Sequence, residues 1–369
     1  MNSSTTPPTD RTAPTATSTK RPSEERLVLA ANRIFHDLEG AHYEEKHDEI
    51  FVAERARWQR IAGTWLAGSA ERQQVLDIGT GTGFVPSVVA PFLQVGDSIT
   101  CTDLSETMLG VAKRRLESLE FVGDFSFQAI DGESYPFPSK SFSAITGNSV
   151  IHHIPDLARL FGELDRVLKP GGIILLGHEP NARHYALPGL RRRVALYSRL
   201  FDPLSTMIGL GKRLGFAALA RRLGIHSRLR GAALAARGGG LAEQVSTSEA
   251  LLDQVAETFV TEGILPEAPS RAQIVEWVDF HSPTAGEEVD PSRGIDVEEI
   301  RSRWLPDYEC LHFESYDHLY GGGHAVRRRA GTDRIDRALA RQYPEGGATL
   351  FAVLRKPSAE PAEGADTPR

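Results

Sequence analysis

The chain of 369 residues contains little cysteine and no long apolar segment. Its two cysteines, Cys101 and Cys310, lie far apart and form no metal-type spacing, so a reducing, cytoplasmic location is the simplest interpretation. No apolar run approaches the roughly 20 residues that a membrane-spanning helix needs. The N-terminus lacks the hydrophobic region of a secretory signal peptide. These absences together predict a cytoplasmic protein.

Several motifs of common enzyme classes are missing as well. The sequence contains no H-E-x-x-H, no paired C-x-x-C, no G-x-S-x-G and no G-x-x-x-x-G-K-[ST]. His42 and His47 have acidic neighbours but match no recognised ligand set, so we expect no metal site. The net charge of −7 gives no general reason to expect a nucleic-acid partner.

The remaining composition is typical of a soluble globular protein, with 40% hydrophobic and 25% charged residues. The chain is long enough for one large domain or two. Its ends differ from the rest, because residues 1–24 are rich in Ser, Thr and Pro and residues 358–369 lack large apolar side chains. We predict that both ends are disordered.

The most informative stretch of the sequence is VLDIGTGTGF, from Val75 to Phe84. Residues that favour a β-strand lead here into a loop with glycine at every second position. Glycine tolerates positive φ and lets backbone N–H groups approach a ligand closely. A helix that begins at Phe84 would direct further N–H groups at the same ligand. The stretch therefore predicts a ligand-binding loop between a strand and a helix.

The spacing of this loop differs from that of a dinucleotide-binding fingerprint. G-x-G-x-x-G would need a glycine at position 84 or 86, where the chain has Phe84 and Pro86. Asp103 follows the next predicted strand, 20 residues beyond Gly83. A carboxylate in this position can accept hydrogen bonds from both hydroxyl groups of a ribose. Alternatively, Asp103 could cap the following helix.

Strands and helices alternate through this part of the chain. Further strands are predicted at residues 125–130, 142–148 and 173–176, and glycine or acidic residues follow consecutive strands. This alternation predicts a doubly wound α/β sheet whose ligand lies at the carboxyl ends of the strands.

Two motifs together resemble the class I S-adenosylmethionine-dependent methyltransferases. They are D-I-G-T-G-T-G at residues 77–83 and R-V-L-K-P-G-G at residues 166–172, the latter followed by an apolar strand. The resemblance covers about residues 70–180 and resumes over 295–357. It implies a Rossmann-like sheet of seven strands, the last antiparallel, with S-adenosylmethionine as cofactor. Residues 181–294 would be a helical insertion into this domain.

The resemblance also implies which residues bind the cofactor. Asp77 and the glycine loop are expected at its methionine part, Asp103 at the ribose, Asp131 at the adenine amino group and Asn148 near the sulfonium. The complete predicted set is Asp77, Gly79, Thr80, Gly81, Gly83, Asp103, Leu104, Asp131, Gly132 and Asn148.

A base that deprotonates the methyl acceptor could come from the loops after the fourth, fifth and sixth strands. These loops contain His152, His153, His178, Glu179, Asp317 and His318. We single out His153 and His178 as catalytic candidates, because both should lie at the sheet edge where ligands bind. Methyl transfer also proceeds by proximity alone, so no base is strictly required.

Helical patterns precede and interrupt the predicted sheet. Residues 25–69 are expected to form a lid over the cofactor, as in the resembled family. In the insertion, residues 181–240 hold twelve Arg and Lys against one acid, and residues 241–305 hold fourteen Asp and Glu against four Arg. The insertion could be a helical substrate lid whose halves partly neutralise each other. Alternatively, basic amphipathic helices within 183–237 could touch a membrane surface or a lipid-like or acidic molecule.

We therefore expect S-adenosylmethionine-dependent methyl transfer to a small or lipid-like molecule, such as a secondary metabolite. One alternative is an enzyme of the same fold that binds this cofactor without methylating, such as a cyclase or isomerase. An NAD-dependent oxidoreductase is disfavoured by Phe84 and Pro86. The sequence predicts neither the methyl acceptor nor the oligomeric state.

Overall fold

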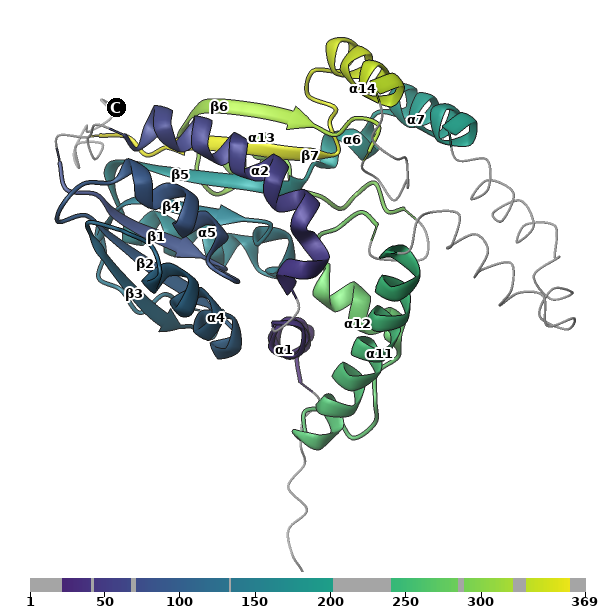
Figure 1. Cartoon of the computed structure of the whole chain (residues 1–369), viewed down its shortest axis with the longest axis horizontal. Coiled ribbons are helices and arrows are strands. Elements are labelled where there is room, and N and C mark those ends of the chain that lie inside the picture. Colours follow the sequence, from purple (N-terminus) through teal and green to yellow (C-terminus); the bar gives the residue numbers. More distant parts are fainter. Residues whose placement is uncertain are drawn as a thin grey trace, which may run out of the picture.

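A seven-stranded sheet forms the centre of the molecule (Figure 1). The computed structural model describes residues 22–40, 43–67, 71–132, 134–201, 240–284, 289–320 and 330–358. Most of the two ends that we predict to be disordered, residues 1–24 and 358–369, lies outside these ranges. The strands are β1 (Gln74–Ile78), β2 (Ser98–Asp103), β3 (Asp124–Ala129), β4 (Phe142–Asn148), β5 (Leu168–Pro180), β6 (Glu309–Tyr316) and β7 (Thr349–Arg355).

The strand order in the sheet is β3-β2-β1-β4-β5-β7-β6. β1 pairs in parallel with β2 and β4, whereas β7 lies antiparallel between β5 and β6. The structure thus confirms the predicted doubly wound Rossmann-like sheet with an antiparallel last strand. The order changes direction between β1 and β4, and a sheet of this kind binds its ligand at the carboxyl edge beside that point.

Helices cover both faces of the sheet and form two apolar cores. On one face, Trp58 packs edge-on against Phe351 of β7, with ring centroids 4.8 Å apart. On the other face, Phe161 stacks on Trp304 at 5.6 Å. The elements of the first face are α2 (Tyr43–Trp65), α3 (Phe84–Val89), η1 (Ala90–Phe92) and α4 (Glu106–Glu117). Those of the second are η2 (Ile151–His153), α5 (Leu157–Val167) and α13 (Val297–Arg303).

The first helix, α1 (Glu24–Glu39), packs against the insertion and not against the sheet. Ser23 caps its N-terminus by accepting a hydrogen bond from the backbone N–H of Arg26. Its apolar side meets α11 (Gly240–Thr261) and α12 (Arg271–Val278) in a third core (Figure 1). The predicted N-terminal segment 25–69 therefore divides, because α2 lies along the sheet while α1 joins the insertion helices.

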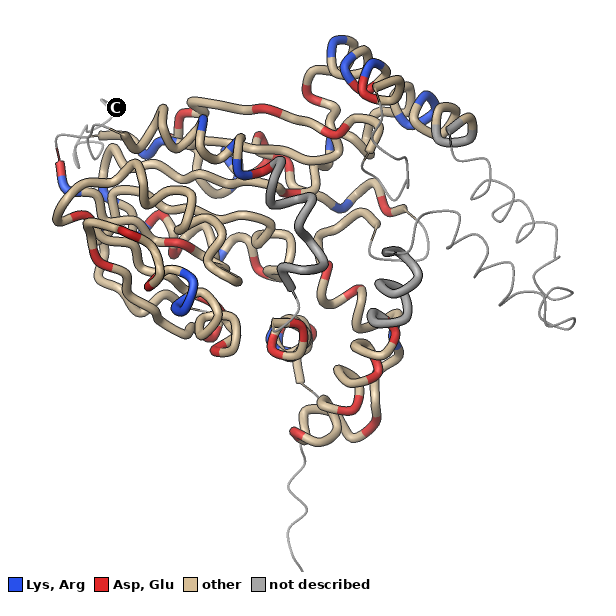
Figure 2. The backbone as a smooth tube through the Cα atoms, viewed as in Figure 1, with Lys and Arg blue, Asp and Glu red and all other residues tan. Residues whose placement is uncertain are grey.

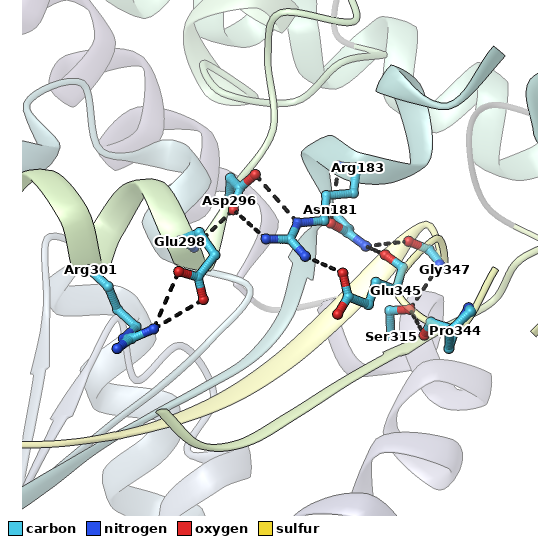
Figure 3. Close-up of polar contacts among 9 residues, drawn as sticks. All are labelled: Asn181, Arg183, Asp296, Glu298, Arg301, Ser315, Pro344, Glu345 and Gly347. Carbon is cyan, nitrogen blue, oxygen red and sulfur yellow. Dashed lines mark hydrogen bonds and ion pairs between the residues drawn. The ribbon is translucent and has the colours of Figure 1, made fainter. Parts of the chain in front are cut away.

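The two ends of the insertion are tied together at the sheet edge (Figure 3). Asn181 forms an isolated parallel bridge with Ile295, and its amide nitrogen donates to the carbonyl oxygens of Glu345 and Gly347, at 2.8 Å each. Arg183 pairs with Asp296 at 3.4 Å and also with Glu345. The long insertion therefore begins and ends at one point beside β5 and β7.

A smaller helical unit lies beyond this point. α6 (Ala182–Ala186) and α7 (Pro188–Phe201) follow β5, and α14 (Ala330–Gln342) precedes β7. Figure 2 shows Lys and Arg gathered on α7 and α14. Of the basic segment 183–237, residues 202–237 lie outside the described residues, so its membrane contact stays a prediction. Within the described ranges, no helix is long and apolar enough to cross a membrane, and the cytoplasmic location also stays a prediction.

The core between α1 and the insertion generates a stability prediction. Phe259 of α11 is fully buried and contacts Trp277, whereas the neighbouring Val260 is 40% exposed. We expect Phe259→Ala to lower the free energy of unfolding by about 3–5 kcal/mol, because it leaves a cavity. The control Val260→Ala should change it by less than about 0.5 kcal/mol. Urea denaturation followed by tryptophan fluorescence measures both, and equal effects would contradict this packing.

Candidate functional site

A pocket opens at the carboxyl ends of β1, β2 and β4, with α1 on its other side. Eight of the twelve predicted site residues line it: Gly79, Thr80, Gly81, Asp103, Leu104, Gly132, Asn148 and His153. Leu29, Asn32 and His36 of α1 complete the wall. The pocket therefore joins the predicted glycine loop to a helix 40 to 50 residues earlier in the chain.

The glycine loop meets the pocket through its backbone. Gly81 has φ +53°, its N–H donates to Asp103 Oδ2 at 2.8 Å, and a Cβ there would find no atom within 4 Å. Open space at this position leaves room for a ligand against the backbone. Gly79 is needed for a different reason, since a Cβ there would lie 2.2 Å from Val150 Cγ2. The loop after β4 therefore packs directly on the glycine loop.

Asp77 is buried below the pocket. Its carboxylate accepts hydrogen bonds from Thr80 Oγ1 at 2.7 Å and from Thr146 Oγ1 at 2.6 Å. Burial raises the pKa of Asp77 to about 7, against the opposing effect of these two hydroxyls. The carboxylate thus joins the end of β1 to the loop and to β4. Gly83 is likewise buried and lies against Ala112 of α4.

Asp103 stands at the end of β2 and lines the pocket. Its Oδ1 accepts from the N–H of Ser105 at 2.9 Å and its Oδ2 from Gly81. Burial raises the pKa of Asp103 to about 6, although these backbone hydrogen bonds oppose the rise. An ionised carboxylate offers about four acceptor positions, so acceptor capacity remains for a hydroxyl group of a ligand. This geometry suits the predicted ribose contact.

The acid predicted at the adenine amino group lies in a different environment. Asp131 is exposed, and its Oδ1 accepts from the backbone N–H of Ser134 at 3.0 Å. Its neighbours Ile130 and Gly132, together with Tyr135, line the pocket instead. The contact of Asp131 with adenine therefore stays a prediction.

Asn148 at the end of β4 is fixed by a tryptophan that the sequence did not reveal as a site residue. Trp58 Nε1 donates to Asn148 Oδ1 at 2.8 Å, so the amide group of Asn148 has a defined orientation at the pocket wall. Trp58 belongs to α2, 90 residues earlier in the chain. No local motif predicts such a contact.

The loop after β4 is held by Glu179, which is fully buried. Its carboxylate accepts from the backbone N–H groups of Val150, Ile151 and His152, at 2.7, 3.1 and 3.3 Å, and from His152 Nδ1 at 2.7 Å. Burial alone would raise the pKa of Glu179, but His152 and the backbone donors outweigh it and lower this pKa. Glu179 therefore fixes the pocket wall and is engaged away from any substrate.

His153 and His178, the two catalytic candidates, lie in separate places. His153 lines the pocket, and its Nδ1 donates to the carbonyl oxygen of Val278. Burial, with the neighbouring His152, lowers the pKa of His153 to about 4. His178 lies on β5 at a register shift, has φ +56°, and is absent from the residues that line the described pocket. The structure therefore brings only His153 to the pocket.

His178 belongs to a polar network between α2, β5 and β6. Its Nδ1 lies 3.3 Å from Glu54 Oε1 and 3.4 Å from Tyr316 Oη, and Tyr316 donates to Glu54 Oε2 at 3.1 Å. Arg57 pairs with Glu54, and its guanidinium stacks 3.3 Å from the Tyr316 ring centroid. Burial and the Glu54 carboxylate raise the pKa of Tyr316 well above its usual value. Glu54 and Tyr316 join this network although they lie 262 residues apart.

Comparison with known proteins finds similarity to methyltransferases over part of the chain. Residues 76–176 match the family model described as a methyltransferase domain. The C-methyltransferase of ubiquinone and menaquinone biosynthesis from Psychromonas ingrahamii is 27% identical over 187 residues, which are 47% of this chain and 74% of that protein. The corresponding protein of Photorhabdus laumondii is 27% identical over 42% of this chain and 60% of its own length.

The match to most of these relatives spans about three fifths of their length. Among solved structures, an S-adenosylmethionine-dependent methyltransferase from Aquifex aeolicus is 20% identical over 35% of this chain and 64% of its own, with a TM-score of 0.31. The family model matches residues 76–176, which contain the glycine loop and the strands β2 to β4.

The buried carboxylate of Glu179, which holds the loop after β4, generates a second prediction on stability. We expect Glu179→Ala to lower the free energy of unfolding by about 3–5 kcal/mol, because it leaves His152 and backbone donors without their buried acceptor. Glu309→Ala, which removes an exposed ion pair with Arg355, should cost no more than about 1 kcal/mol. Urea denaturation measures both changes, and a Glu179 variant as stable as the control would show that the loop does not depend on this carboxylate.

Proposed function

Because residues 76–176 match the model of a methyltransferase domain, we propose that the chain transfers the methyl group of S-adenosylmethionine to a small molecule. The observation that carries the proposal is Asp103 with Gly81: a carboxylate with free acceptor positions beside an open glycine backbone, both lining one pocket. Asp103 suits the hydroxyl groups of a ribose, and the open backbone at Gly81 suits the methionine part of the cofactor.

The residues present fit the cofactor in named roles. S-adenosylmethionine supplies a methyl group that its sulfonium has already activated, so the protein forms no covalent intermediate. Asp103 would accept from the ribose hydroxyls, Leu104 and Gly132 would flank the adenine, and the backbone at Gly79, Thr80 and Gly81 would hold the methionine part. Asn148 would orient a polar group near the sulfonium. The protein's task is to align the acceptor in line with the methyl group and to exclude water.

We propose that the acceptor is a small, partly apolar ring compound methylated at carbon. The relatives named above are C-methyltransferases of quinone biosynthesis, which supports this class. The similarity covers only the cofactor-binding half, and the insertion helices α11 and α12 reach the pocket region through α1. The insertion would therefore select the individual acceptor.

We propose that His178, which lies outside the lining of the cofactor pocket but follows Gly177 beside Asn148, takes the proton of the acceptor in preference to His153. If Glu54 accepts the Nδ1–H of His178, Nε2 remains free to take a proton from the acceptor, as in other His–carboxylate pairs. His178 also lies on β5 next to Gly177, the register partner of Asn148 on β4. The low pKa of His153 leaves it a weak base at neutral pH.

Calorimetric titration tests the cofactor. We expect the chain to bind S-adenosylmethionine and S-adenosylhomocysteine but not NAD, and Asp103→Ala to weaken binding about tenfold to hundredfold, because each hydrogen bond to a charged group contributes about 1.5–3 kcal/mol. Since the pKa of Asp103 is about 6, affinity should fall as the pH drops from 7.5 to 5 and the carboxylate is protonated.

The Asp103→Ala variant is also the control for this pH dependence. Asp77 also titrates in this range, because burial and, to a lesser degree, the charge of Asp103 raise its pKa to about 7, so the pH dependence lost in the variant belongs to the two coupled acids together. Binding of NAD alone would contradict the proposal. Cofactor binding without release of S-adenosylhomocysteine in the presence of acceptors would favour a non-methylating cyclase or isomerase.

Turnover tests His178. With radiolabelled S-adenosylmethionine and 1,4-naphthohydroquinone as a ring-bearing probe, we expect His178→Ala to lower kcat about 10²- to 10⁴-fold while the Kd of the cofactor is unchanged. His312→Ala on β6, where His312 faces Glu314 at 3.4 Å, is the matched control. Full turnover by His178→Ala would remove this residue from the mechanism and leave proximity as the source of catalysis.

A further inference from the structure

A cluster of nitrogen and oxygen ligands lies where the insertion meets the loop after β4. His152 and His153 come from η2, and Asp279 follows α12. One ligand atom from each of the three residues lies within 4.8 Å of the others. We propose that His152, His153 and Asp279 bind a divalent transition-metal ion, with zinc as the first candidate. This proposal does not rest on methyl transfer.

The orientation of both imidazoles supports ligation. His152 Nδ1 lies 2.7 Å from Glu179 Oε2, and His153 Nδ1 contacts the carbonyl oxygen of Val278. Both partners are acceptors only, so each imidazole carries a proton on Nδ1 and its Nε2 is available as a ligand. Metal-binding histidines are typically held in this way by a carboxylate or a carbonyl group on the other ring nitrogen.

The carboxylate completes a mixed ligand set. Asp279 Oδ1 lies 3.9 Å from His152 Nε2, which is too long for a hydrogen bond. Two ligands of one tetrahedral zinc ion are about 3.4 Å apart. The pair of His152 and Asp279 would therefore close by about half an ångström, and pairs as wide as 4.8 Å in this cluster would close by about 1.4 Å, through rotation of the side chains. Two imidazoles with one carboxylate favour zinc or a similar transition metal over magnesium and calcium.

Neighbouring contacts hold the same elements together. His281 donates its backbone N–H to the carbonyl oxygen of His152 at 2.8 Å, and its Nε2 lies 3.0 Å from the carbonyl oxygen of Ile154. These contacts join the two elements and leave the Nε2 atoms of His152 and His153 unused. Two carboxylates, Glu179 and Asp279, face the imidazole of His152 and favour a cation there. Three protein ligands would leave one coordination position open.

We expected no metal site from the sequence, because the chain contains no metal-binding motif. The residues of this cluster match no such motif either, since they come from distant segments. Val278 lies 125 residues beyond His153, so only the docking of α12 against η2 brings the third ligand to the two histidines.

Metal titration of the full chain tests the proposal. After treatment with EDTA and dialysis, we expect calorimetry with zinc chloride to show one site per chain, with a Kd of micromolar or lower. Asp279→Ala should weaken binding at least tenfold, and Glu179→Gln about 10- to 100-fold through the orientation of His152. His281→Gln is the matched control, because it alters the same junction without removing a ligand, and its affinity should equal that of the wild type.

Cobalt(II) provides a second readout, since visible absorption bands should appear with the wild type and His281→Gln but not with Asp279→Ala. The Asp279 side chain is 44% exposed, and circular dichroism with S-adenosylhomocysteine titration checks that the variant is folded. Absence of zinc binding by the wild type would overturn the proposal. Equal zinc affinity in the wild type and Asp279→Ala would also overturn it, because the zinc would then be bound by other residues. Either result would leave the cofactor proposal untouched.

Discussion

The arrangement of the site depends on one buried charge, the carboxylate of Glu179. A buried carboxylate is costly unless several donors surround it, and here three backbone N–H groups and the His152 imidazole do so. These donors all belong to the short loop after β4, so the charge on β5 fixes the course of that loop. The loop in turn places Val150 against Gly79 and His153 at the pocket wall. The glycine loop and the pocket thus share one electrostatic support.

The acids around the pocket differ in role because they differ in burial and partners. Asp77 bonds to two threonine hydroxyls beneath the loop and stabilises the junction of β1 and β4. Asp103 bonds to two backbone N–H groups and keeps acceptor capacity at the pocket surface. Both have raised pKa values because burial disfavours the charged form. A ligand that donates hydrogen bonds to Asp103 would therefore favour its ionised form.

The sequence predicted the sheet and the glycine loop well, because both depend on local patterns. Each glycine turn or acid directly follows its own apolar strand, and the structure confirms the doubly wound sheet that this alternation predicts. The seven strands with an antiparallel last strand were implied by the family resemblance, and the structure confirms them too. Contacts that join distant segments could not be predicted. Trp58 reaches Asn148 from 90 residues away, and Glu54 reaches Tyr316 from 262 residues away. A single sequence contains no signal for such pairs, since each residue alone is ordinary at its position.

Contacts between distant segments also connect the insertion to the pocket. α1 supplies Leu29, Asn32 and His36 to the pocket wall, yet its apolar side is buried against α11 and α12. The position of α1 therefore depends on the insertion helices, whose α12 is also tied to the loop after β4 through Val278 and His281. A molecule that displaced α12 would change both the wall formed by α1 and the loop formed by η2. The insertion helices thus contact both α1 and η2, so the two parts of the pocket wall are physically coupled through α12.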